Sequence, residues 1–312
     1  MNGQLKIFAG NANPELAKKI AKFLKVPVGK ALVTTFSEGE VRVKIEEDVR
    51  GRDVYLVQPT CPPTNNNLME LLIMIDAMRR ASARRITAVM PYFGYARQDR
   101  KDQPRVPITA KLVANLLTTA GADRILTMDL HASQIQGFFD IPMDHLFAVK
   151  TMVDYFEKKK IKNLVVASPD VGGIKMARAY AKRLGANLAI VDKRRIDDKH
   201  AEVMNILGEV KGKNIVIVDD LVSTASSICE ASSALKKAGA LKIFAAISHP
   251  VLSGPAIERI GNSSIEEFVV TDSIPIDEKK KIPAIKVLSV AALLGEAIKR
   301  IHDEESVSIL FQ

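Results

Sequence analysis

Two adjacent carboxylates, Asp219 and Asp220, follow directly on the apolar, β-branched run of residues 214–218. Small hydroxyl residues come next, and a helical pattern follows them. A strand that leads through a short loop to a helix N-terminus forms an anion site, because free backbone N–H groups and the helix dipole converge there. The carboxylates repel an anion, so their natural partners are sugar hydroxyls or a Mg²⁺ ion that bridges to phosphate oxygens. The segment therefore predicts a phosphorylated-sugar site; an ordinary capped turn with an exposed acidic pair is the alternative.

A second phosphate loop is indicated after the apolar run 163–168, where Asp170 and Val171 precede the glycine pair Gly172 and Gly173. Two consecutive glycines let the backbone approach an anion closely, and Asp170 could meet the metal of that anion. Double glycine also serves any tight turn. Its occurrence at another strand end favours the ligand interpretation, since ligands of open α/β sheets gather outside the carboxyl ends of the strands.

Asp129 and His131 occupy alternating positions after the apolar run 124–128. Alternating side chains at the end of a strand project to the same side, so this pair could bind a divalent ion directly or through water. A core histidine held by a hydrogen bond is the alternative interpretation.

Three other segments combine residues suited to a nucleotide. The segment 91–102 mixes aromatic rings with cations and carboxylates, so it could grip a base and phosphates or form a salt-bridged interface. The segment 36–40 offers an aromatic ring and acidic contacts to a purine and ribose. The basic segment that contains Lys193 and Arg195 could close over a reacting polyphosphate and neutralise its charge, or could equally be a surface charge run.

Strand-like and helix-like segments alternate along nearly the whole chain, which predicts an α/β fold with parallel sheets. The expected strands are residues 5–9, 53–58, 85–90, 124–128, 163–168, 187–191, 214–218, 242–248 and 265–271. The expected helices are residues 14–24, 67–81, 107–120, 149–159, 173–184, 227–238, 255–261 and 291–302.

The two halves of the chain share a layout in which a strand, a polar loop and a helix are followed by a strand and an acidic loop. This pattern suggests a duplication, and we place the domain boundary between an N-terminal domain, residues 1–148, and a C-terminal domain, residues 149–312. The final residues 306–311 alternate like a strand that could dock onto either domain.

The composition is that of a globular protein, with 47% hydrophobic and 26% charged residues in 312. A formal net charge of +9 favours anionic partners. The absence of tryptophan argues against a base-stacking platform, so no nucleic-acid partner is expected. No apolar run is long enough to cross a membrane, no signal-peptide layout is present, and the two cysteines form no disulfide framework, which together favour a cytoplasmic protein.

Taken together, these motifs closely resemble the ribose-phosphate pyrophosphokinases, or phosphoribosyl pyrophosphate (PRPP) synthetases, over essentially the whole chain. The motifs that carry the resemblance are Tyr95-Ala-Arg-Gln-Asp-Arg-Lys101, Asp129-Leu-His-Ala-Ser-Gln-Ile-Gln-Gly-Phe-Phe139, Asp192-Lys-Arg-Arg195, Ala201-Glu-Val-Met-Asn205 and His249-Pro-Val-Leu-Ser-Gly-Pro255. The resemblance implies two phosphoribosyltransferase-like domains, each a mainly parallel sheet flanked by helices. It also implies transfer of diphosphate from ATP to the 1-hydroxyl of ribose 5-phosphate, giving PRPP and AMP.

The resemblance assigns a role to each group of residues. Lys193 and Arg195 match the catalytic loop of the family. ATP would be held by Phe36, Glu38, Gly39, Glu40, Arg97 and Gln98. Ribose 5-phosphate would be held by Arg195, Asp219, Asp220, Ser223, Thr224, Ala225, Ser226 and Ser227. The diphosphate loop would be Asp170, Val171, Gly172 and Gly173, and the Mg²⁺ contacts would be His131 and Asp170, with Asp129 nearby.

The family resemblance further implies a homohexamer, activation by inorganic phosphate and inhibition by ADP. Its usual allosteric positions correspond to Arg50, Ser82, Gln136, Ser306 and Ser308. The sugar-phosphate loop of the family usually reads Asp-Thr-Gly/Ala-Gly-Thr, so Ser223 lacks an acidic group and Ser226 replaces a glycine. Glu38 stands where aspartate is common.

Three rival functions follow from the same residues. A non-catalytic regulatory homologue that binds PRPP synthetase subunits would tend to lose catalytic residues or gain insertions, yet His131, Lys193 and Arg195 are all present. A phosphoribosyltransferase that consumes PRPP would not explain Arg97 and Gln98. A nucleic-acid-binding regulator would fit the basic charge, but no helix-turn-helix or appended basic arm is visible.

Overall fold

The computed structural model describes residues 3–194 and 203–311, and the chain divides into two compact units. Unit 1 comprises residues 1–147, 273–275 and 289–312, and unit 2 comprises residues 148–272 and 276–288. The division after residue 147 lies one residue from the expected domain boundary. The C-terminal segment 289–312 differs from the expectation, because it packs with unit 1 although it follows unit 2 in the sequence.

Unit 1 is built on a five-stranded parallel sheet with the order β1-β4-β5-β6-β7 and a separate antiparallel hairpin, β2-β3. All four strand pairs of the larger sheet are parallel. β4 is buried along its whole length, as expected of a central strand with helices on both faces. The strands are β1 (Leu5–Ala9), β2 (Ala31–Thr35), β3 (Val41–Ile45), β4 (Asp53–Val57), β5 (Arg85–Met90), β6 (Arg124–Met128) and β7 (Met143–Leu146).

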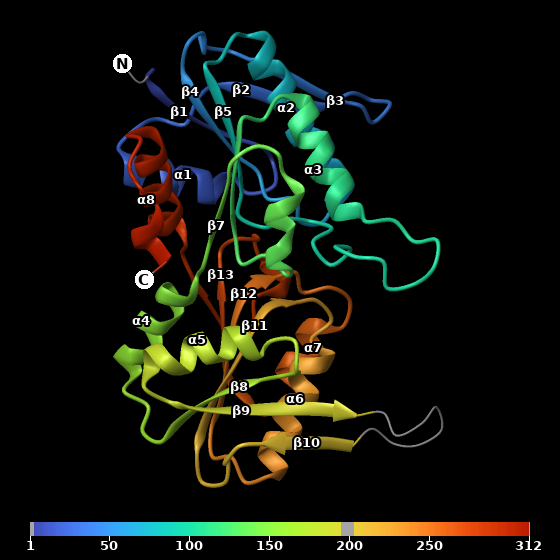
Figure 1. The fold of residues 1–312 in the computed structure, drawn as a ribbon, viewed down its shortest axis with the longest axis vertical. Helices are drawn as coiled ribbons and strands as arrows, with labels where there is room; N and C mark the ends of the chain where they lie inside the picture. The colour runs from blue at the N-terminus through green and yellow to red at the C-terminus, as the bar shows by residue number, and fades with distance from the viewer. Residues whose placement is uncertain (1–2, 195–202, 312) are drawn as a thin grey trace. The chain divides into compact units, whose positions relative to one another are not determined.

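Helices cover both faces of this sheet: α2 and α3 lie on one side and α1 and α8 on the other (Figure 1). The backbone of α8 approaches α1 closely at Gly295, where a Cβ atom would lie 2.5 Å from the ring of Phe23. The helices are α1 (Pro14–Leu24), α2 (Thr64–Arg80), α3 (Thr109–Ala120) and α8 (Ala291–His302), with short 3-10 helices at η1 (Ser133–Phe138) and η3 (Ser308–Phe311).

Unit 2 contains a seven-stranded sheet with the order β10-β9-β8-β11-β12-β13-β14, in which only the β9–β10 pair is antiparallel. β11 is therefore a central strand, with β8 on one side and β12 on the other. The strands are β8 (Leu164–Ser168), β9 (Asn187–Arg194), β10 (Val203–Leu207), β11 (Asn214–Val222), β12 (Ile243–Pro250), β13 (Ile265–Thr271) and β14 (Ile285–Leu288).

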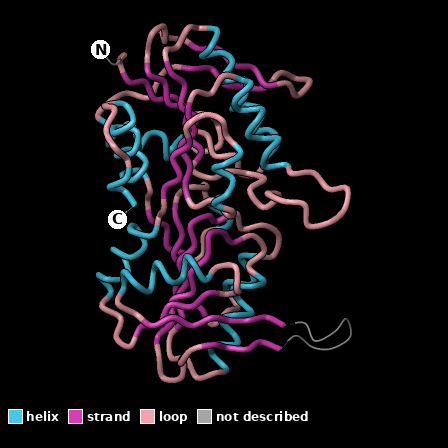
Figure 2. The backbone as a smooth tube through the Cα atoms, in the orientation of Figure 1, coloured by secondary structure: helices cyan, strands magenta, loops and turns pink. Residues whose placement is uncertain are grey.

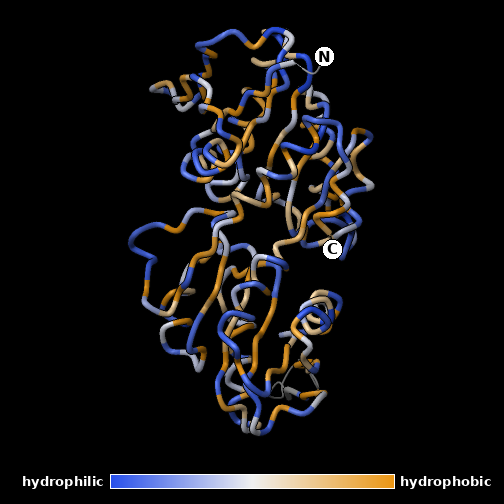
Figure 3. The backbone as a smooth tube through the Cα atoms, turned by 90° about the vertical axis from the view of Figure 1, so that its left-hand side faces the viewer, coloured by the Kyte–Doolittle hydropathy of each residue, from blue (hydrophilic) through white to orange (hydrophobic). Residues whose placement is uncertain are grey.

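The sheet of unit 2 also lies between two helical layers. One apolar cluster joins alternate strand residues such as Ile215 and Ile217 to α6 and α7, and the other joins the intervening residues Val216 and Val218 to α4 and α5. Figure 3 shows the largely apolar strands of this core and the mixed helices that cover it. The helices are α4 (Val149–Lys159), α5 (Ile174–Leu184), α6 (Ser226–Lys237) and α7 (Ala256–Gly261), with a 3-10 turn at η2 (Glu278–Lys280).

The expected α/β class is confirmed, since each unit is a mainly parallel sheet flanked by helices. Every expected strand and helix is present, with bounds that agree to within a few residues. The expectation of a C-terminal strand at residues 306–311 is wrong: this segment ends in the 3-10 helix η3, and the Leu310 N–H donates to the Val307 carbonyl at 3.0 Å. Five strands were not expected from the sequence, namely β2, β3, β7, β10 and β14.

Candidate functional site

The carboxyl ends of β8 and β11 bring two of the expected phosphate loops to the same edge of the unit 2 sheet. The strands are parallel neighbours in which Ala167 pairs with Ile217, so the loop at Asp170 and the loop at residues 223–225 follow adjacent strands. One expectation needs correction: β11 continues to Val222, so Asp219 and Asp220 lie within the last part of the strand and not after it. Asp219 pairs there with Ile247 of β12.

The acidic pair is crowded with negative charge. Burial, the neighbouring charge of Asp220 and a hydrogen bond with that residue, and the charge of Asp170 together hold the pKa of Asp219 well above its usual range. A backbone bond from the Asp220 N–H to Asp219 Oδ1, 2.9 Å long, opposes this shift. Such a cluster favours donors or cations in front of it, because either would relieve the repulsion between the carboxylates.

The loop after β8 is organised by its own side chains. Asp170 Oδ1 accepts a 2.9 Å hydrogen bond from the Gly173 N–H, and the Ser168 hydroxyl donates a 2.7 Å bond to the Asp170 carbonyl. A Cβ atom on Gly173 would lie 2.6 Å from Ser168 Oγ, so this close approach requires glycine. Val171 is exposed and Gly172 lies between it and the start of α5.

The loop after β11 leads directly into α6, as the sequence predicts. Ala225 is the N-cap residue and has the left-handed φ of 60°, and no side chain caps the first turn. Ser226 and Ser227 are the first residues of the helix, and the Ser226 hydroxyl donates a 2.7 Å bond to Glu230 Oε1. The first-turn N–H groups therefore have no side-chain acceptor, which suits an incoming anion.

Of the two expected catalytic cations, Lys193 is the one whose backbone the structure describes. Lys193 lies in β9 and pairs with Met204 of β10, so it extends the strand beyond the expected end at residue 191. Arg195 lies outside the described residues.

In unit 1, the argument that Asp129 and His131 project to one side of a strand is wrong. β6 ends at Met128, and Asp129 has a left-handed φ of 40°, so the strand alternation stops before the pair. Asp129 is buried and His131 is exposed. Within residues 3–194 and 203–311, no group of three or more histidine, cysteine, aspartate or glutamate side chains is placed to hold a metal ion by itself.

The expected nucleotide residues of segment 36–40 form the tip of the β2–β3 hairpin. The Phe36 N–H donates to the Glu40 carbonyl at 2.8 Å, and Gly39 takes the left-handed φ of 98° that the turn requires. The ring of Phe36 is 44% exposed, and the guanidinium of Arg42 lies 5.4 Å from its centroid. The Ser37 hydroxyl, which donates to Glu38, lowers the pKa of that carboxyl.

Arg97 and Gln98 lie in the long connection 91–108 between β5 and α3, drawn as an extended loop in Figure 2. Gln98 anchors the loop to α3, because its carbonyl accepts from the Ala110 N–H at 3.1 Å and its side chain accepts from Thr109. Arg97 is exposed. The hairpin tip and this connection are different segments of unit 1, so the expected ATP residues come from two separate parts of the chain.

Comparisons with known proteins agree with the expected family over both halves of the chain. Residues 5–121 match the N-terminal domain of ribose phosphate pyrophosphokinase, and residues 194–312 match the phosphoribosyl synthetase-associated domain. A ribose-phosphate pyrophosphokinase of Chlorobaculum tepidum is 60% identical over 312 residues, covering 100% of this chain and 96% of that protein. The chain belongs to the ribose-phosphate pyrophosphokinase family.

Other family members agree with this assignment. The ribose-phosphate pyrophosphokinase of Bacillus subtilis is 56% identical, with 98% of this chain and 97% of that protein covered. A crystal structure of phosphoribosylpyrophosphate synthetase from Mycobacterium smegmatis superimposes with a TM-score of 0.92 at 43% identity, over 96% of this chain and 99% of that one. None of the helices in the described part of the chain has the length and apolar character needed to span a membrane.

The five residues that were expected at allosteric positions all belong to unit 1. Arg50 and Ser82 lie on neighbouring segments, since the Gly51 N–H donates to the Ser82 carbonyl at 2.9 Å. The Ser306 and Ser308 hydroxyls are 2.7 Å apart just after α8. Gln136 is exposed on η1, where its amide donates to the Ser133 carbonyl at 2.9 Å.

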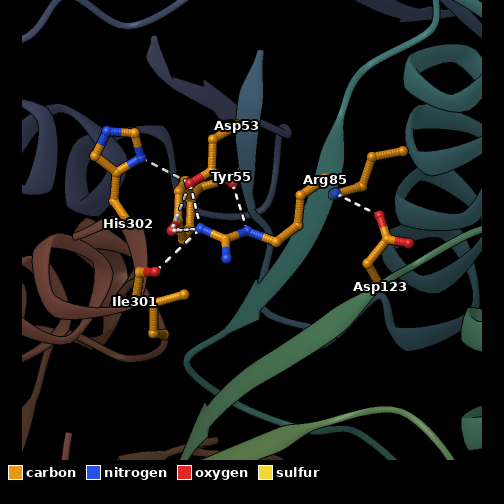
Figure 4. Close-up of polar contacts among 7 residues, drawn as sticks. Asp53, Tyr55, Arg85, Asp123, Ile301 and His302 are labelled. Atoms are coloured by element: carbon orange, nitrogen blue, oxygen red, sulfur yellow. Dashed lines mark hydrogen bonds and ion pairs between the residues drawn. The ribbon is translucent and has the colours of Figure 1, made fainter. Parts of the chain in front are cut away.

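A polar cluster at the opposite, amino-terminal edge of the unit 1 sheet was not expected from the sequence (Figure 4). Arg85 Nε donates a 2.8 Å bond to the buried Asp53 carboxylate, and Tyr55 donates to the same group at 3.1 Å. His302 Nδ1 lies 2.7 Å from Asp53, and Arg85 also donates to the Ile301 carbonyl at 3.0 Å. The cluster thus ties the end of α8 to β4 and β5.

Proposed function

We propose that the chain transfers the diphosphate group of ATP to the 1-hydroxyl of ribose 5-phosphate and releases PRPP and AMP. The observation that carries this proposal is the edge of unit 2, where the crowded carboxylates of Asp219 and Asp220 lead into an uncapped helix N-terminus. This arrangement suits a sugar phosphate, because carboxylates accept hydrogen bonds from hydroxyls while backbone N–H groups receive a phosphate.

We assign the ribose 5-phosphate site to Asp219, Asp220 and the loop of residues 223–227, with Arg195 as a further phosphate ligand. The hydroxyl of Ser226 is already bonded to Glu230, so Ser223, Thr224 and Ser227 are the side-chain donors of this loop. The diphosphate is assigned to the loop of residues 170–173, which follows the neighbouring strand.

Mg²⁺ is the proposed cofactor, and the residues fit such an ion. Asp129, His131 and Asp170 are the proposed contacts. Mg²⁺ usually keeps several waters and binds proteins through one or two carboxylates plus substrate phosphates, so it needs no complete protein cage. The repulsion around Asp219 and Asp170 also favours a cation nearby. When bound, Mg²⁺ would neutralise charge on the phosphate oxygens of ATP.

The transfer needs positioning and cations more than a covalent nucleophile, because the sugar hydroxyl attacks the β-phosphorus in line with the leaving AMP. We assign Lys193 to stabilising the charge that develops on the phosphates and Arg195 to closing on them. The ATP contacts are assigned to Phe36, Glu38, Gly39, Glu40, Arg97 and Gln98. An exposed aromatic ring at Phe36 provides a stacking face for a purine.

The quaternary structure and regulation are proposals that rest on family membership. We infer a cytoplasmic homohexamer that inorganic phosphate activates and ADP inhibits, with Arg50, Ser82, Gln136, Ser306 and Ser308 as the effector contacts. Sedimentation velocity with and without phosphate tests the assembly, and a hexamer is the expected species.

A coupled assay tests the proposed reaction. The purified protein is incubated with ATP, ribose 5-phosphate and Mg²⁺, and a phosphoribosyltransferase that consumes PRPP serves as the detector. We expect product only when both substrates and the metal are present. A protein that gives no product alone but raises the rate of an active family member would instead support the regulatory-subunit function.

A further inference from the structure

The short segment between β12 and α7, together with Arg259 in the last turn of α7, holds the loop that we assign to ribose 5-phosphate. The Leu252 N–H donates to the Val222 carbonyl at 3.0 Å, and the Ser253 N–H donates to the Ser223 carbonyl at 2.9 Å. Arg259 Nη1, from α7, donates to the next carbonyl, that of Thr224, at 3.0 Å. The three consecutive carbonyls of residues 222–224, at the end of β11 and the start of the loop, are therefore bonded to one segment of unit 2, residues 252–259.

The direction of these bonds decides where the loop presents its donors. A trans peptide is planar, and its C=O and N–H groups point in opposite directions. Because Arg259 holds the Thr224 carbonyl toward α7, the N–H of Ala225 points away from α7. The described residues provide no protein acceptor for the N–H groups of Thr224 and Ala225. These groups are thus available to an anion in front of the loop.

The loop contains one residue, Ala225, in a backbone conformation that alanine disfavours. Ala225 has a φ of 60°, in the left-handed region that disfavours a residue with a Cβ atom. In the usual motif of the family this position is glycine or alanine. Glycine adopts the left-handed φ without strain, so the strain arises only in members that have alanine here. A charged donor on the preceding carbonyl is a direct way to keep the Thr224–Ala225 peptide in this orientation.

We propose that Arg259 is a positioning residue for ribose 5-phosphate: it holds the Thr224 carbonyl and thereby aims the Ala225 N–H at the phosphate. The inference rests on the proposed function of the loop. Arg259 acts through the loop and not by touching the reacting atoms, so its loss should weaken sugar-phosphate binding and leave the ATP contacts unchanged.

The surroundings of Arg259 make a substitution practicable. The residue is exposed and borders a cavity of about 480 Å³ between α6 and α7, which is also lined by Cys229, Glu258 and Asn262. A shorter polar side chain there stays in contact with water, so it leaves no buried group without a partner. Glu258 lines the same cavity from the neighbouring position of α7, which makes Glu258→Gln a matched control.

The test compares Arg259→Gln, Arg259→Lys and Glu258→Gln with the wild type. Titration calorimetry with ribose 5-phosphate measures binding without turnover, and steady-state kinetics gives the KM for each substrate. We expect Arg259→Gln to raise the Kd and KM for ribose 5-phosphate about tenfold. The KM for ATP should change by less than about twofold. Arg259→Lys, which keeps a charged donor, should show about a threefold rise, and Glu258→Gln should match the wild type.

An unchanged Kd for ribose 5-phosphate in Arg259→Gln would overturn the inference, and so would an equal rise in the KM for both substrates. If circular dichroism shows that the glutamine variant does not fold, the lysine variant decides: a selective rise for the sugar phosphate supports the inference and no rise overturns it. A wild-type protein that fails to bind ribose 5-phosphate would instead contradict the proposed function itself, which separates the two failures.

Discussion

The imidazole Nδ1 of His302 lies 2.7 Å from a carboxylate oxygen of Asp53, although 249 positions separate the two residues in the chain. His302 ends α8, and Asp53 begins β4, the second strand of the unit 1 sheet. The contact therefore attaches α8 to the sheet of unit 1 (Figure 4). Ser306 and Ser308, which are proposed effector residues, follow α8 within a few positions. The contact between His302 and Asp53 therefore fixes the start of the segment that carries them.

Asp53→Asn should loosen α8. Burial raises the pKa of Asp53, but hydrogen bonds and charges from Arg85 and His302 outweigh it and leave this pKa below its usual range. Replacing the carboxylate removes these charge-assisted bonds, which we expect to cost about 1–3 kcal/mol. Hydrogen exchange followed by mass spectrometry should show faster exchange in α8. The control is Asp76→Asn, whose ion pair with Arg80 is exposed and should contribute little.

The sign of the pH effect follows from the direction of the Asp53 shift. A carboxylate whose pKa is lowered in the folded state stabilises the fold above its unfolded pKa, at about 4, and loses that contribution as pH falls through its folded pKa. The wild type and Asp53→Asn should thus differ in α8 exchange at pH 7, begin to approach each other below about pH 4, and converge only at pH values below the lowered pKa of Asp53 in the folded state. Equal exchange in the two proteins at pH 7 would contradict this role of Asp53.

Asp219→Asn should raise thermal stability at neutral pH while it weakens sugar binding. Burial and the charges of Asp220 and Asp170 raise the pKa of Asp219, so the ionised form is disfavoured in the folded state. A group of this kind costs stability when it is ionised, and the cost disappears as pH falls and the carboxyl takes up a proton. We expect a melting temperature about 3 °C higher at pH 7.5, and no difference in acid.

The measurement for Asp219→Asn is circular dichroism melting at two pH values, with Asp154→Asn on the exposed face of α4 as the control. Calorimetry should show a higher Kd for ribose 5-phosphate in Asp219→Asn alone. A variant that is less stable than the wild type at pH 7.5 would show that the carboxylates are not crowded as the structure indicates.

Lys193→Ala should reduce turnover far more than ATP affinity. A cation that stabilises developing charge acts mainly in the transition state, and removing one such donor costs about 100-fold in kcat. The KM for ATP should change by less than about threefold in steady-state assays. The control is Lys237→Ala, an exposed lysine in the last turn of α6. Equal losses in kcat and ATP affinity would mean that Lys193 binds the ground state.

His131→Ala should raise the Mg²⁺ concentration needed for half-maximal activity by about tenfold, since one contact to the metal is lost. Ser133→Ala, at a nearby exposed position, should keep the wild-type requirement. The measurement is an activity titration with Mg²⁺ at fixed ATP and ribose 5-phosphate. Unchanged metal dependence in His131→Ala would remove this residue from the metal site.

Much of the fold was predictable because long apolar runs and capped helices are local signals. β5, β6, α1 and α8 begin and end at the expected residues. The strands that were missed are short or lie at edges, as β7 and β10 do, so no continuous apolar run marks them. β3 is different, because apolar and charged residues alternate along it in the sequence Val41-Arg-Val-Lys-Ile45. This period-2 pattern is a local signal for a strand, although it contains no continuous apolar run.

The candidate site was predictable only where its residues follow one another in the sequence. The loop of residues 223–227 is a local pattern, and it lies at a helix N-terminus as expected. The attachment of α8 by Asp53, Arg85 and His302 depends on contacts between distant segments, which no local pattern encodes. The strand ending at Met128 was anticipated, but the left-handed φ of Asp129 was not, because nothing in the sequence requires it there.

The most direct test of the proposed reaction is ³¹P NMR of the purified protein with ATP, ribose 5-phosphate, Mg²⁺ and inorganic phosphate. Transfer of the intact diphosphate predicts loss of the ATP signals, appearance of AMP, and two coupled signals from a sugar-linked diphosphate. ADP together with a sugar 1-phosphate would show transfer of a single phosphoryl group, and ATP that stays intact would show no transfer. Either of these results would contradict the proposed function.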